Sequence, residues 1–357
     1  MEKLYELNKQ KNTESKMIKF AVIGQGHIGK RHAEMIRENT DSELVAVCDI
    51  LSKEELGLEN ISEKYFTNFD DLLNANLDID VINICTPNGS HADYAIKALK
   101  ARKHVVLEKP IALTKLDAEK ILFKSLEMSR HVFSVMQNRY SPPSVWLKEL
   151  IDNKVLGDIF IVKLDCFWNR DDRYYKNGNW HGDANLDGGT LFTQFSHFID
   201  IMYWLFGDIQ NICGKFADFS HKDLTDFEDS GLVTFNFING GIGCLNYSTA
   251  VWDTNLESSI TILGSKGTVK VSGQYMNEVS YCHIKDYVMP ELNPSNPPND
   301  YGLYKGSAQN HHYVIENVIE KLNDKGNITT NVLEGLKVVE IIERIYAVRD
   351  AQWKKIK

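Results

Sequence analysis

The sequence predicts an α/β fold in which a doubly wound parallel sheet is followed by an α+β domain with a large, mostly antiparallel, open sheet. Up to about Gln137, short apolar runs alternate with helical segments, as they do in βαβ units. Few polar residues interrupt these runs, which is typical of a sheet covered on both faces. After Gln137, several runs alternate apolar and polar residues, which favours an antiparallel sheet with one face turned to solvent or to another subunit.

In the first half, strands and helices are expected to take turns along the chain. The expected strands are Ile18–Ile23, Glu43–Cys48, a short piece at 65–67, Val81–Cys85, His104–Leu107 and Val132–Val135. The expected helices are about Ile28–Glu38, a piece that carries Leu72 and Leu73, Ser90–Ala101 and Leu116–Ser129.

The dipeptide Pro142-Pro143 marks the change of pattern. A helix is expected at Val145–Asn153, and strands are expected at Ile159–Phe167, Asn211–Phe219, Gly231–Phe237, Gly241–Ser248, Ser258–Leu263 and Gly267–Ser272. A helix at Leu191–Phe206, an irregular loop at Pro290–Asn299 and closing helices at Asn310–Asn323 and Val332–Asp350 complete the expected order. We therefore expect an extension without assigned function at 1–16, a first domain at 17–138 and a second at 139–357, whose terminal helices can pack back on the first.

The composition excludes several classes of protein. A net charge of −9 without a cluster of Lys and Arg argues against nucleic acid as a partner. No stretch approaches the roughly 18 apolar residues that span a bilayer, and the charged first 16 residues lack the apolar run of a signal peptide. The six cysteines stand far apart without zinc-ligand spacing, so we expect reduced thiols, a cytoplasmic location and no metal site.

A glycine-rich segment lies between the first expected strand and the first expected helix. It reads Gly24-Gln25-Gly26-His27-Ile28-Gly29, and Asp49 ends the next strand. Glycines at this spacing allow a tight turn, a close approach of backbone to a pyrophosphate, and close packing of helix on strand. We count Gly24, Gly26, His27, Ile28, Gly29 and Asp49 as cofactor-binding residues.

Asp49 decides which dinucleotide is preferred. A carboxylate at the end of this strand accepts hydrogen bonds from ribose hydroxyls and repels a 2′-phosphate, which favours NAD over NADP. The alternatives are a glycine turn that binds no ligand and an aspartate that only caps a helix.

Two further loops follow expected strands at their carboxyl ends, where open α/β sheets bind ligands. One reads Cys85-Thr86-Pro87-Asn88-Gly89-Ser90-His91, and the other reads Glu108-Lys109-Pro110. A lysine at a strand end can donate to a substrate hydroxyl and stabilise developing negative charge. Alone, the second loop is equally consistent with a solvated surface segment.

Together, the three motifs resemble those of the glucose–fructose oxidoreductase, inositol dehydrogenase and rhizopine catabolism family, Gfo/Idh/MocA, from Ile18 to about Arg349. The resemblance implies a Rossmann domain, a second domain whose open sheet forms subunit contacts in a homodimer or homotetramer, a nicotinamide cofactor, and a sugar or cyclitol substrate. It also implies site residues: Thr86, Pro87, Asn88, His91, Glu108, Lys109 and Gln137 at the cofactor, and Lys109 and Asn138 at the substrate.

In the second domain, the family pattern places an Asp four residues before a His and another Asp three residues after it. His197 and Asp200 match, whereas Thr193 stands where many sugar dehydrogenases have Asp. The tripeptide Trp180-His181-Gly182 and Gln194 resemble enzymes that act on UDP-N-acetylglucosaminuronate. Trp180, Thr193 and Gln194 are therefore counted among the substrate-binding residues.

The expected chemistry is oxidation of a secondary alcohol. His197 is expected to be the general base, because the pKa of histidine lies near neutrality, and Lys109 to stabilise the alkoxide. A hydrogen-bonded core histidine is the alternative for His197. Arginine forks suit a carboxylate or diphosphate and tyrosines suit sugar rings, so Arg139, Arg170, Tyr174 and Tyr175 complete the expected substrate site.

The sequence thus predicts an NAD-dependent enzyme acting on a CH–OH group. The substrate predicted first is a UDP-N-acetylhexosamine or its uronate, oxidised at C3 for surface polysaccharide synthesis. The alternatives are a free-sugar or inositol dehydrogenase, an NAD-dependent glycosidase, and a non-catalytic NAD-sensing regulator on the same fold.

Overall fold

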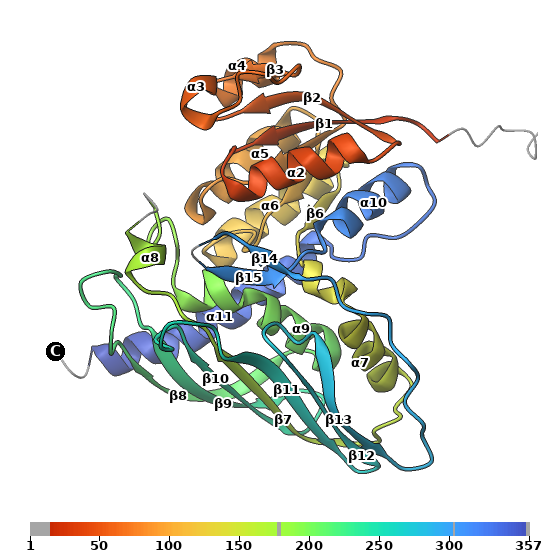
Figure 1. Ribbon diagram of the computed structural model, residues 1–357, viewed down its shortest axis with the longest axis vertical. Coiled ribbons are helices and arrows are strands. Elements are labelled where there is room, and N and C mark those ends of the chain that lie inside the picture. The colour runs from red at the N-terminus through yellow and green to blue at the C-terminus, as the bar shows by residue number, and fades with distance from the viewer. Residues whose placement is uncertain (1–14, 177–179, 303, 355–357) are drawn as a thin grey trace, which may run out of the picture.

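The computed structural model describes residues 15–176, 180–302 and 304–354. Figure 1 shows a parallel sheet with its helices at one end of the molecule and a large second sheet at the other. The predicted extension at 1–16 lies outside the described residues except for its last two positions. Among the described residues, no helix has the length and apolar character to cross a membrane.

The first sheet has the topology of a Rossmann fold, as predicted. Its strands are β1 (Ile18–Ile23), β2 (Ser42–Cys48), β3 (Lys64–Phe66), β4 (Val81–Ile84), β5 (His104–Leu107) and β6 (Val132–Ser134). They are all parallel, in the order β3-β2-β1-β4-β5-β6. The order reverses between β1 and β4, and in such sheets the ligand lies outside the carboxyl ends of the strands at this point.

Helices cover both faces of this sheet. The helical segments of this part are α2 (His27–Glu38), α3 (Lys53–Leu56), α4 (Phe69–Asn74), the 3₁₀ turn η1 (Asn88–Ser90), α5 (His91–Lys100) and α6 (Lys115–Met128), of which α3 buries no residue. The sequence analysis missed α3, which is too short for an apolar period. A capping box of Ser52 and Glu55 begins this helix, and Gly57, with a φ of +65°, ends it.

The second sheet is mostly antiparallel, as predicted. It consists of β7 (Ile159–Phe167), β8 (Ile209–Ala217), β9 (Ser230–Phe237), β10 (Ile242–Ser248), β11 (Glu257–Gly264), β12 (Gly267–Ser272) and β13 (Glu278–Ile284). The order is β13-β12-β11-β7-β10-β9-β8, and β7 pairs in parallel only with β10.

Two strands of this sheet differ from expectation. Strand β8 begins and ends two residues earlier, because Asn211 adopts a φ of +55° at an irregular pairing that breaks the alternation. Strand β13 was missed because it is an edge strand with mostly exposed side chains, so its apolar alternation is weak.

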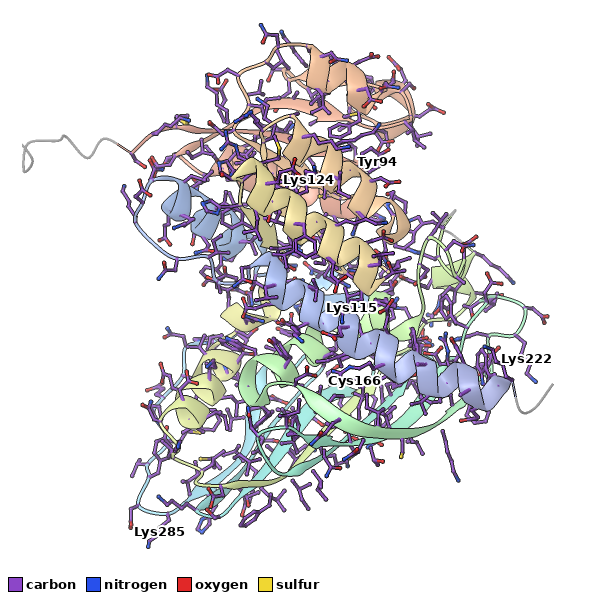
Figure 2. The ribbon with its side chains drawn as sticks, turned by 180° about the vertical axis from the view of Figure 1, so that it is seen from behind. Tyr94, Lys115, Lys124, Cys166, Lys222 and Lys285 are labelled. Atoms are coloured by element: carbon purple, nitrogen blue, oxygen red, sulfur yellow. The ribbon has the colours of Figure 1, made fainter. Side chains whose placement is uncertain are left out.

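Helices cover only one face of the second sheet (Figure 1). They are α7 (Pro142–Asp152), α9 (Ser196–Phe206) and α11 (Val332–Trp353). Helix α7 starts three residues earlier than expected, because Pro142 and Pro143 occupy its first turn, where a missing N–H has no cost. In the view from behind, α11 lies beside α6, and Lys115 on α6 donates to Glu340 on α11 at 2.8 Å (Figure 2).

The helix predicted at Leu191–Phe206 is two segments rather than one. Residues Leu191–Phe195 wind as a π-helix, η3, and α9 begins at Ser196. Single π turns of this kind are frequent at functional sites, and a pattern of apolar residues does not predict them.

The C-terminal part returns to the first domain. The short hairpin β14 (Pro298–Asp300) and β15 (Lys305–Ala308) lies between the two sheets in Figure 1, and it begins at the end of the loop predicted for 290–299. The next helix, α10 (His311–Leu322), packs on α2 and on the 3₁₀ turn η2 (Gln137–Tyr140). Val314, Ile315 and Val318 share one apolar cluster with Ile18 and Phe20 of β1.

Candidate active site

Each glycine of the first loop meets a different physical requirement. Gly24 has a φ of +82°, and a Cβ there would lie 2.6 Å from the Cys85 carbonyl oxygen. A Cβ on Gly29 would lie 1.7 Å from the Gly24 carbonyl oxygen, so helix and strand could not pack. A Cβ on Gly26 would meet no atom within 4 Å. The open space beside Gly26, at the N-terminus of α2, is where a pyrophosphate fits.

Asp49 is held beside this loop. Its Oδ2 accepts a hydrogen bond from the Gln25 backbone N–H at 2.5 Å, and its Oδ1 accepts one from Leu51 at 3.0 Å. The side chain is half-buried at the end of β2. This placement suits the predicted contact with ribose hydroxyls.

The second loop joins the two sheets. The Asn88 Nδ2 donates to the Asp187 carbonyl oxygen at 2.9 Å and to the Thr193 Oγ1 at 2.8 Å, and the Gly89 N–H donates to the Leu186 carbonyl at 2.9 Å. A Cβ on Gly89 would lie 2.1 Å from the Asn185 carbonyl oxygen. The loop therefore contacts the segment that leads into η3.

The predicted cofactor residues Thr86, Pro87 and His91 lie in or directly after this loop. The ring nitrogens of buried His91 lie 2.7 Å and 2.8 Å from the carbonyl oxygens of Pro110 and Thr86. His91 thereby connects the loops after β4 and β5. Thr86 accepts a hydrogen bond from the Ser90 hydroxyl at 2.8 Å, and a direct contact of Thr86, Pro87 or His91 with the cofactor stays a prediction.

Glu108 lies in a buried cluster with two histidines that the sequence analysis missed. His32 Nε2 lies 2.9 Å and His311 Nε2 3.6 Å from the Glu108 Oε1, and the Lys109 backbone N–H donates to Oε2. Burial raises the pKa of Glu108, but the hydrogen bond from His32, together with the nearby His311 and Lys109, outweighs it and lowers the pKa to about 2. Asn83 Nδ2 donates to His32 Nδ1, which leaves Nε2 to donate to Glu108.

In the described part of the chain, these are also the three side chains that come close enough to share a metal ion. The direct hydrogen bond between His32 and Glu108 explains why these two side chains lie together, and it requires no metal ion. Since the three residues come from α2, the end of β5 and the start of α10, no sequence spacing could have revealed them.

Lys109 and His197 are near enough to this cluster and to each other for their charges to interact. Lys109 Nζ donates to the Thr193 carbonyl oxygen at 2.5 Å. Burial, opposed by the charges of Glu108 and Asp187, lowers the pKa of Lys109 to about 8. Burial and the charge of Lys109 hold the pKa of His197 well below its ordinary value. At neutral pH the pair is therefore a protonated lysine beside a neutral imidazole.

Several buried polar atoms lack a protein partner at this place. Within the described ranges, these atoms include Gln137 Oε1, Asn138 Nδ2 and His197 Nδ1. Asn138 Oδ1 accepts a hydrogen bond from Ser307 at 2.6 Å. Since unpaired buried polar groups are costly, these atoms fit a site that binds a polar ligand. These unpaired polar atoms and the open space at Gly26 together fit a bound dinucleotide.

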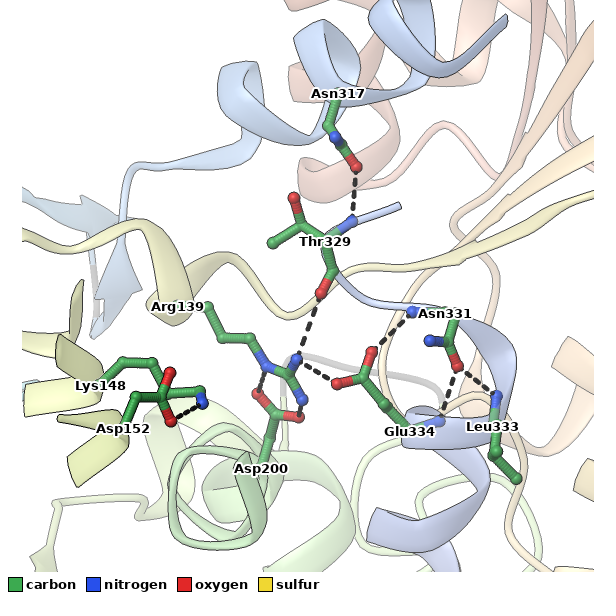
Figure 3. Close-up of polar contacts among 9 residues, drawn as sticks. All are labelled: Arg139, Lys148, Asp152, Asp200, Asn317, Thr329, Asn331, Leu333 and Glu334. Carbon is green, nitrogen blue, oxygen red and sulfur yellow. Dashed lines mark hydrogen bonds and ion pairs between the residues drawn. The ribbon is translucent and has the colours of Figure 1, made fainter. Parts of the chain in front are cut away.

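Arg139 lies in a buried ion-pair network, and its predicted contact with the substrate stays a prediction. Its Nε and Nη2 donate to Asp200 at 2.7 Å and 2.6 Å, and its Nη1 donates to Glu334 at 2.6 Å and to the Thr329 carbonyl at 3.3 Å (Figure 3). The guanidinium lies 5.1 Å from the Trp204 ring and is fully buried. Four of its five N–H groups thus hold η2, α9 and α11 together.

Arg170 is the opposite case, a buried arginine that has neutral partners. Its Nε donates to the Gln194 Oε1 at 2.7 Å, and its other nitrogens donate to the carbonyls of Asn169 and Lys305 and to Asn255 Oδ1. The rings of Trp168, Tyr174 and Tyr304 lie 4.8–5.2 Å from the guanidinium carbon. Among the described residues, no carboxylate forms an ion pair with Arg170, and burial lowers its pKa.

The remaining predicted substrate residues lie around Arg170. The Gln194 Nε2 donates to the Tyr174 hydroxyl at 2.8 Å. The Tyr174 ring stacks on His181 at 4.3 Å, and His181 contacts the partly exposed Trp180 at 4.0 Å. Tyr175 is buried and packs on Tyr174 and His221. Residues 177–179, next to Trp180, lie outside the described residues.

The hairpin β14–β15 adds residues that the sequence analysis did not name. The Tyr301 ring lies 5.5 Å from His27 of the glycine loop, Arg31 donates to Asn299 Oδ1, and Tyr304 packs on Tyr174 at 4.9 Å. The hairpin therefore spans from the glycine loop to the surroundings of Arg170. Its strands have three and four residues, too few for a recognisable alternation.

Comparisons with known proteins agree with this architecture. A model described as an oxidoreductase family with an NAD-binding Rossmann fold matches residues 18–136, and a GFO/IDH/MocA C-terminal domain matches residues 145–270. The predicted NAD cofactor is thereby confirmed, as is an oxidoreductase acting on CH–OH groups.

Three relatives illustrate the range of substrates. The crystal structure of the WlbA dehydrogenase from Bordetella pertussis, in complex with NADH and UDP-GlcNAcA, has a TM-score of 0.81 at 29% identity and covers 94% of this chain and 98% of its own. D-glucoside 3-dehydrogenase of Escherichia coli is 28% identical and covers 66% of this chain and 72% of its own length. Inositol 2-dehydrogenase of Salmonella typhimurium is 27% identical over 62% of this chain and 65% of its own length, just under two thirds.

Proposed function

The chain belongs to the Gfo/Idh/MocA family of NAD-binding oxidoreductases, and from this premise we propose that it oxidises C3 of a UDP-linked N-acetylhexosamine or its uronate. The observation that carries this choice is Arg170, a buried guanidinium with three aromatic neighbours and no carboxylate partner in the described chain. A buried charge normally has an opposite charge beside it. A uronate or diphosphate supplies this charge, whereas inositol and neutral free sugars do not.

The proposed mechanism divides the reaction between cofactor and protein. NAD supplies the acceptor for the hydride. A ring nitrogen of neutral His197 accepts the hydroxyl proton, and Lys109 Nζ donates a hydrogen bond to the same oxygen, so that its charge stabilises the alkoxide-like transition state. Glu108 would accept a hydrogen bond from a ribose hydroxyl of the bound cofactor, and Gln137 and Asn138 would orient the nicotinamide and the substrate.

The direct test is NADH formation by the purified chain. UDP-N-acetylglucosaminuronate and UDP-N-acetylglucosamine are compared with glucose, a glucoside and myo-inositol, first at catalytic and then at stoichiometric enzyme, so that an unfavourable equilibrium does not hide the reaction. We expect NADH with the UDP-sugars and little with the free compounds. The reverse preference would replace the proposal by its main alternative, a free-sugar or inositol dehydrogenase, which the glucoside and inositol relatives also support.

The other two alternatives have readouts of their own. Release of nitrophenol from a nitrophenyl glycoside without net NADH would indicate a glycosidase on this scaffold. Binding of NADH without turnover of any compound would indicate a sensor. Lys109 and His197 argue for an enzyme, because a sensor needs neither a base nor an oxyanion stabiliser.

The cellular setting proposed for the reaction is the cytoplasm, in the synthesis of surface polysaccharide precursors. The six cysteines are all free, including the exposed Cys213, which suits a reducing compartment. Fractionation of cells that express the chain, and loss of the polysaccharide in a deletion strain, test the two parts of this proposal.

A further inference from the structure

Asp187 is a buried carboxylate that the proposed mechanism does not use. It lies just before η3, where its side chain is almost fully covered. Oδ2 accepts a hydrogen bond from the Gly182 backbone N–H at 3.0 Å, and Oδ1 accepts one from the Thr193 hydroxyl. Neither partner is a cation, so the negative charge lacks a direct neutralising contact.

Thr193 connects this carboxylate to Lys109. Its carbonyl oxygen accepts from Lys109 Nζ at 2.5 Å, and its hydroxyl contacts Asp187 Oδ1. Asn88 Nδ2 donates to the same hydroxyl oxygen at 2.8 Å, so the single hydroxyl proton points at Asp187, whose carboxylate is a nearer acceptor than its carbonyl oxygen at 2.9 Å. One residue thus holds the ammonium of Lys109 on its backbone and the carboxylate of Asp187 on its side chain.

The charges of Lys109 and Asp187 stabilise each other. Burial raises the pKa of Asp187 to about 6, against the hydrogen bonds from Thr193, Gly182 and Gly189 and the charge of Lys109. Burial lowers the pKa of Lys109 to about 8, against the charges of Glu108 and Asp187. The other titratable groups that face the pair are Arg170, His181, His197 and His311 near Lys109, and Tyr174 and Tyr175 near Asp187.

We propose that Asp187, acting through Thr193, is a positioning residue that keeps Lys109 protonated and aimed at the substrate oxygen. Thr193 stands where many sugar dehydrogenases have an aspartate. In this chain the carboxylate of Asp187 contacts the Thr193 hydroxyl instead. This inference rests on the proposed dehydrogenase function, in which a protonated Lys109 stabilises the alkoxide.

The pH dependence of kcat/KM is the first test. In the wild type we expect an acid limb near pH 6, where protonation of Asp187 weakens its hold on Thr193 and misaligns a still protonated Lys109, and an alkaline limb near pH 8, where Lys109 loses its proton. Because the pKa of His197 lies well below its ordinary value, His197 does not produce the acid limb. In Asp187→Asn the acid limb disappears, and the alkaline limb moves down by roughly one pH unit, since Lys109 has lost a nearby negative charge.

Thr193 provides a matched pair of variants. Thr193→Val removes the hydroxyl at equal volume, so Asp187 loses a hydrogen bond, its pKa rises and the acid limb moves up. Thr193→Ser restores the hydroxyl and the wild-type limbs. A lower kcat/KM with both limbs in place, in Asp187→Asn and in Thr193→Val, would indicate a merely structural role and overturn the proposal.

A second test does not depend on turnover. The C=O infrared band of a buried protonated carboxyl is titrated in the wild type, with Asp187→Asn as the blank that identifies the band. Lys109→Met removes the cation and should raise the Asp187 midpoint by roughly one unit, by the same coupling. Lys115→Met, the same change at the exposed end of α6, should leave it in place.

The two tests separate the inference from the proposed function. If no alcohol is oxidised but the Asp187 midpoint moves in Lys109→Met, the proposed function fails and the coupling of the two charges stands. If NADH forms from a UDP-sugar but the midpoint stays unchanged in Lys109→Met, the inference fails and the function stands.

Discussion

Lys109 and His197 are the two side chains at which catalysis and cofactor binding are measured separately. His197 is not among the predicted cofactor-binding residues, so we expect His197→Ala to bind NADH with unchanged affinity, whereas Lys109→Ala can also weaken NADH binding; both variants should lose roughly 10²- to 10⁴-fold in kcat. The double variant should lose less than the product of the single losses, because both groups act on one oxygen. NADH fluorescence titration and steady-state kinetics measure the two properties, and full activity of the double variant would contradict both assigned roles.

Arg139 is expected to matter for stability rather than for the reaction. Replacing it by Ala leaves the buried carboxylate of Asp200 without its two hydrogen bonds, which costs about 3–5 kcal/mol of unfolding free energy. Urea denaturation of the variant measures this loss. The exposed ion pair of Lys148 and Asp152, on neighbouring α7, is the control, and Lys148→Ala should change the free energy by less than about 1 kcal/mol (Figure 3).

At the residue scale, the sequence predicted the site residues that directly follow strands. It did not predict the site residues that only tertiary packing places there. Lys109 and Glu108 follow β5 directly, and the carboxyl ends of parallel strands meet at one edge. Asp187, His32 and His311 come from a loop, a helix face and a distant helix start. Arg139 shows a further limit, since its type and position suggested a ligand contact and gave no sign of its ion pairs with Asp200 and Glu334.

At the scale of elements, the glycine loop permits a prediction with an internal control. Gly26 has a φ of −68° and open space in place of a Cβ, so Gly26→Ala should fold with an unchanged melting temperature and bind NADH at least roughly tenfold more weakly, about 1.4 kcal/mol. The added methyl group occupies the approach of the pyrophosphate.

Gly29→Ala should show the reverse order of effects. Its Cβ would overlap the Gly24 carbonyl oxygen, so α2 must move away from β1. We therefore expect a lower melting temperature for Gly29→Ala, even without NADH. Equal losses of stability in both variants would mean that the loop has no open face for a ligand.

The elements predicted correctly share one property, which is that many of their residues are buried on a regular period. Strands β1, β2, β4, β5, β6 and β7 have nearly the predicted bounds because burial selects apolar residues there, whereas β3 was found although none of its residues is buried. The missed elements include α3, α8 (Asp172–Tyr175), β13, the β14–β15 hairpin and the π turn of η3. They are short, exposed or irregular, so burial leaves no period in their sequence.

At the scale of the whole molecule, the outer face of the second sheet is the expected site of self-association. Ile161, Leu232, Ile242 and Tyr281 are exposed on this face, between 39% and 58%, and α7, α9 and α11 cover the opposite one. The pairings place Ile161 directly beside Ile242. Apolar side chains of neighbouring strands, mixed with polar ones, are typical of a subunit interface.

We therefore expect light scattering to give the mass of a homodimer or homotetramer, and Ile242→Lys to reduce it, because the new charge would be buried without a partner in the interface. Phe123→Lys is the matched control. Phe123 is equally apolar and is 65% exposed, but it lies on α6 of the Rossmann domain, so this change should leave the mass unaltered. A monomeric wild type, or an oligomer that only Phe123→Lys dissociates, would exclude the second sheet as the interface. Since Lys109 and His197 lie on the covered side of that sheet, the Ile242→Lys protein should still bind NADH, which would separate assembly from cofactor binding.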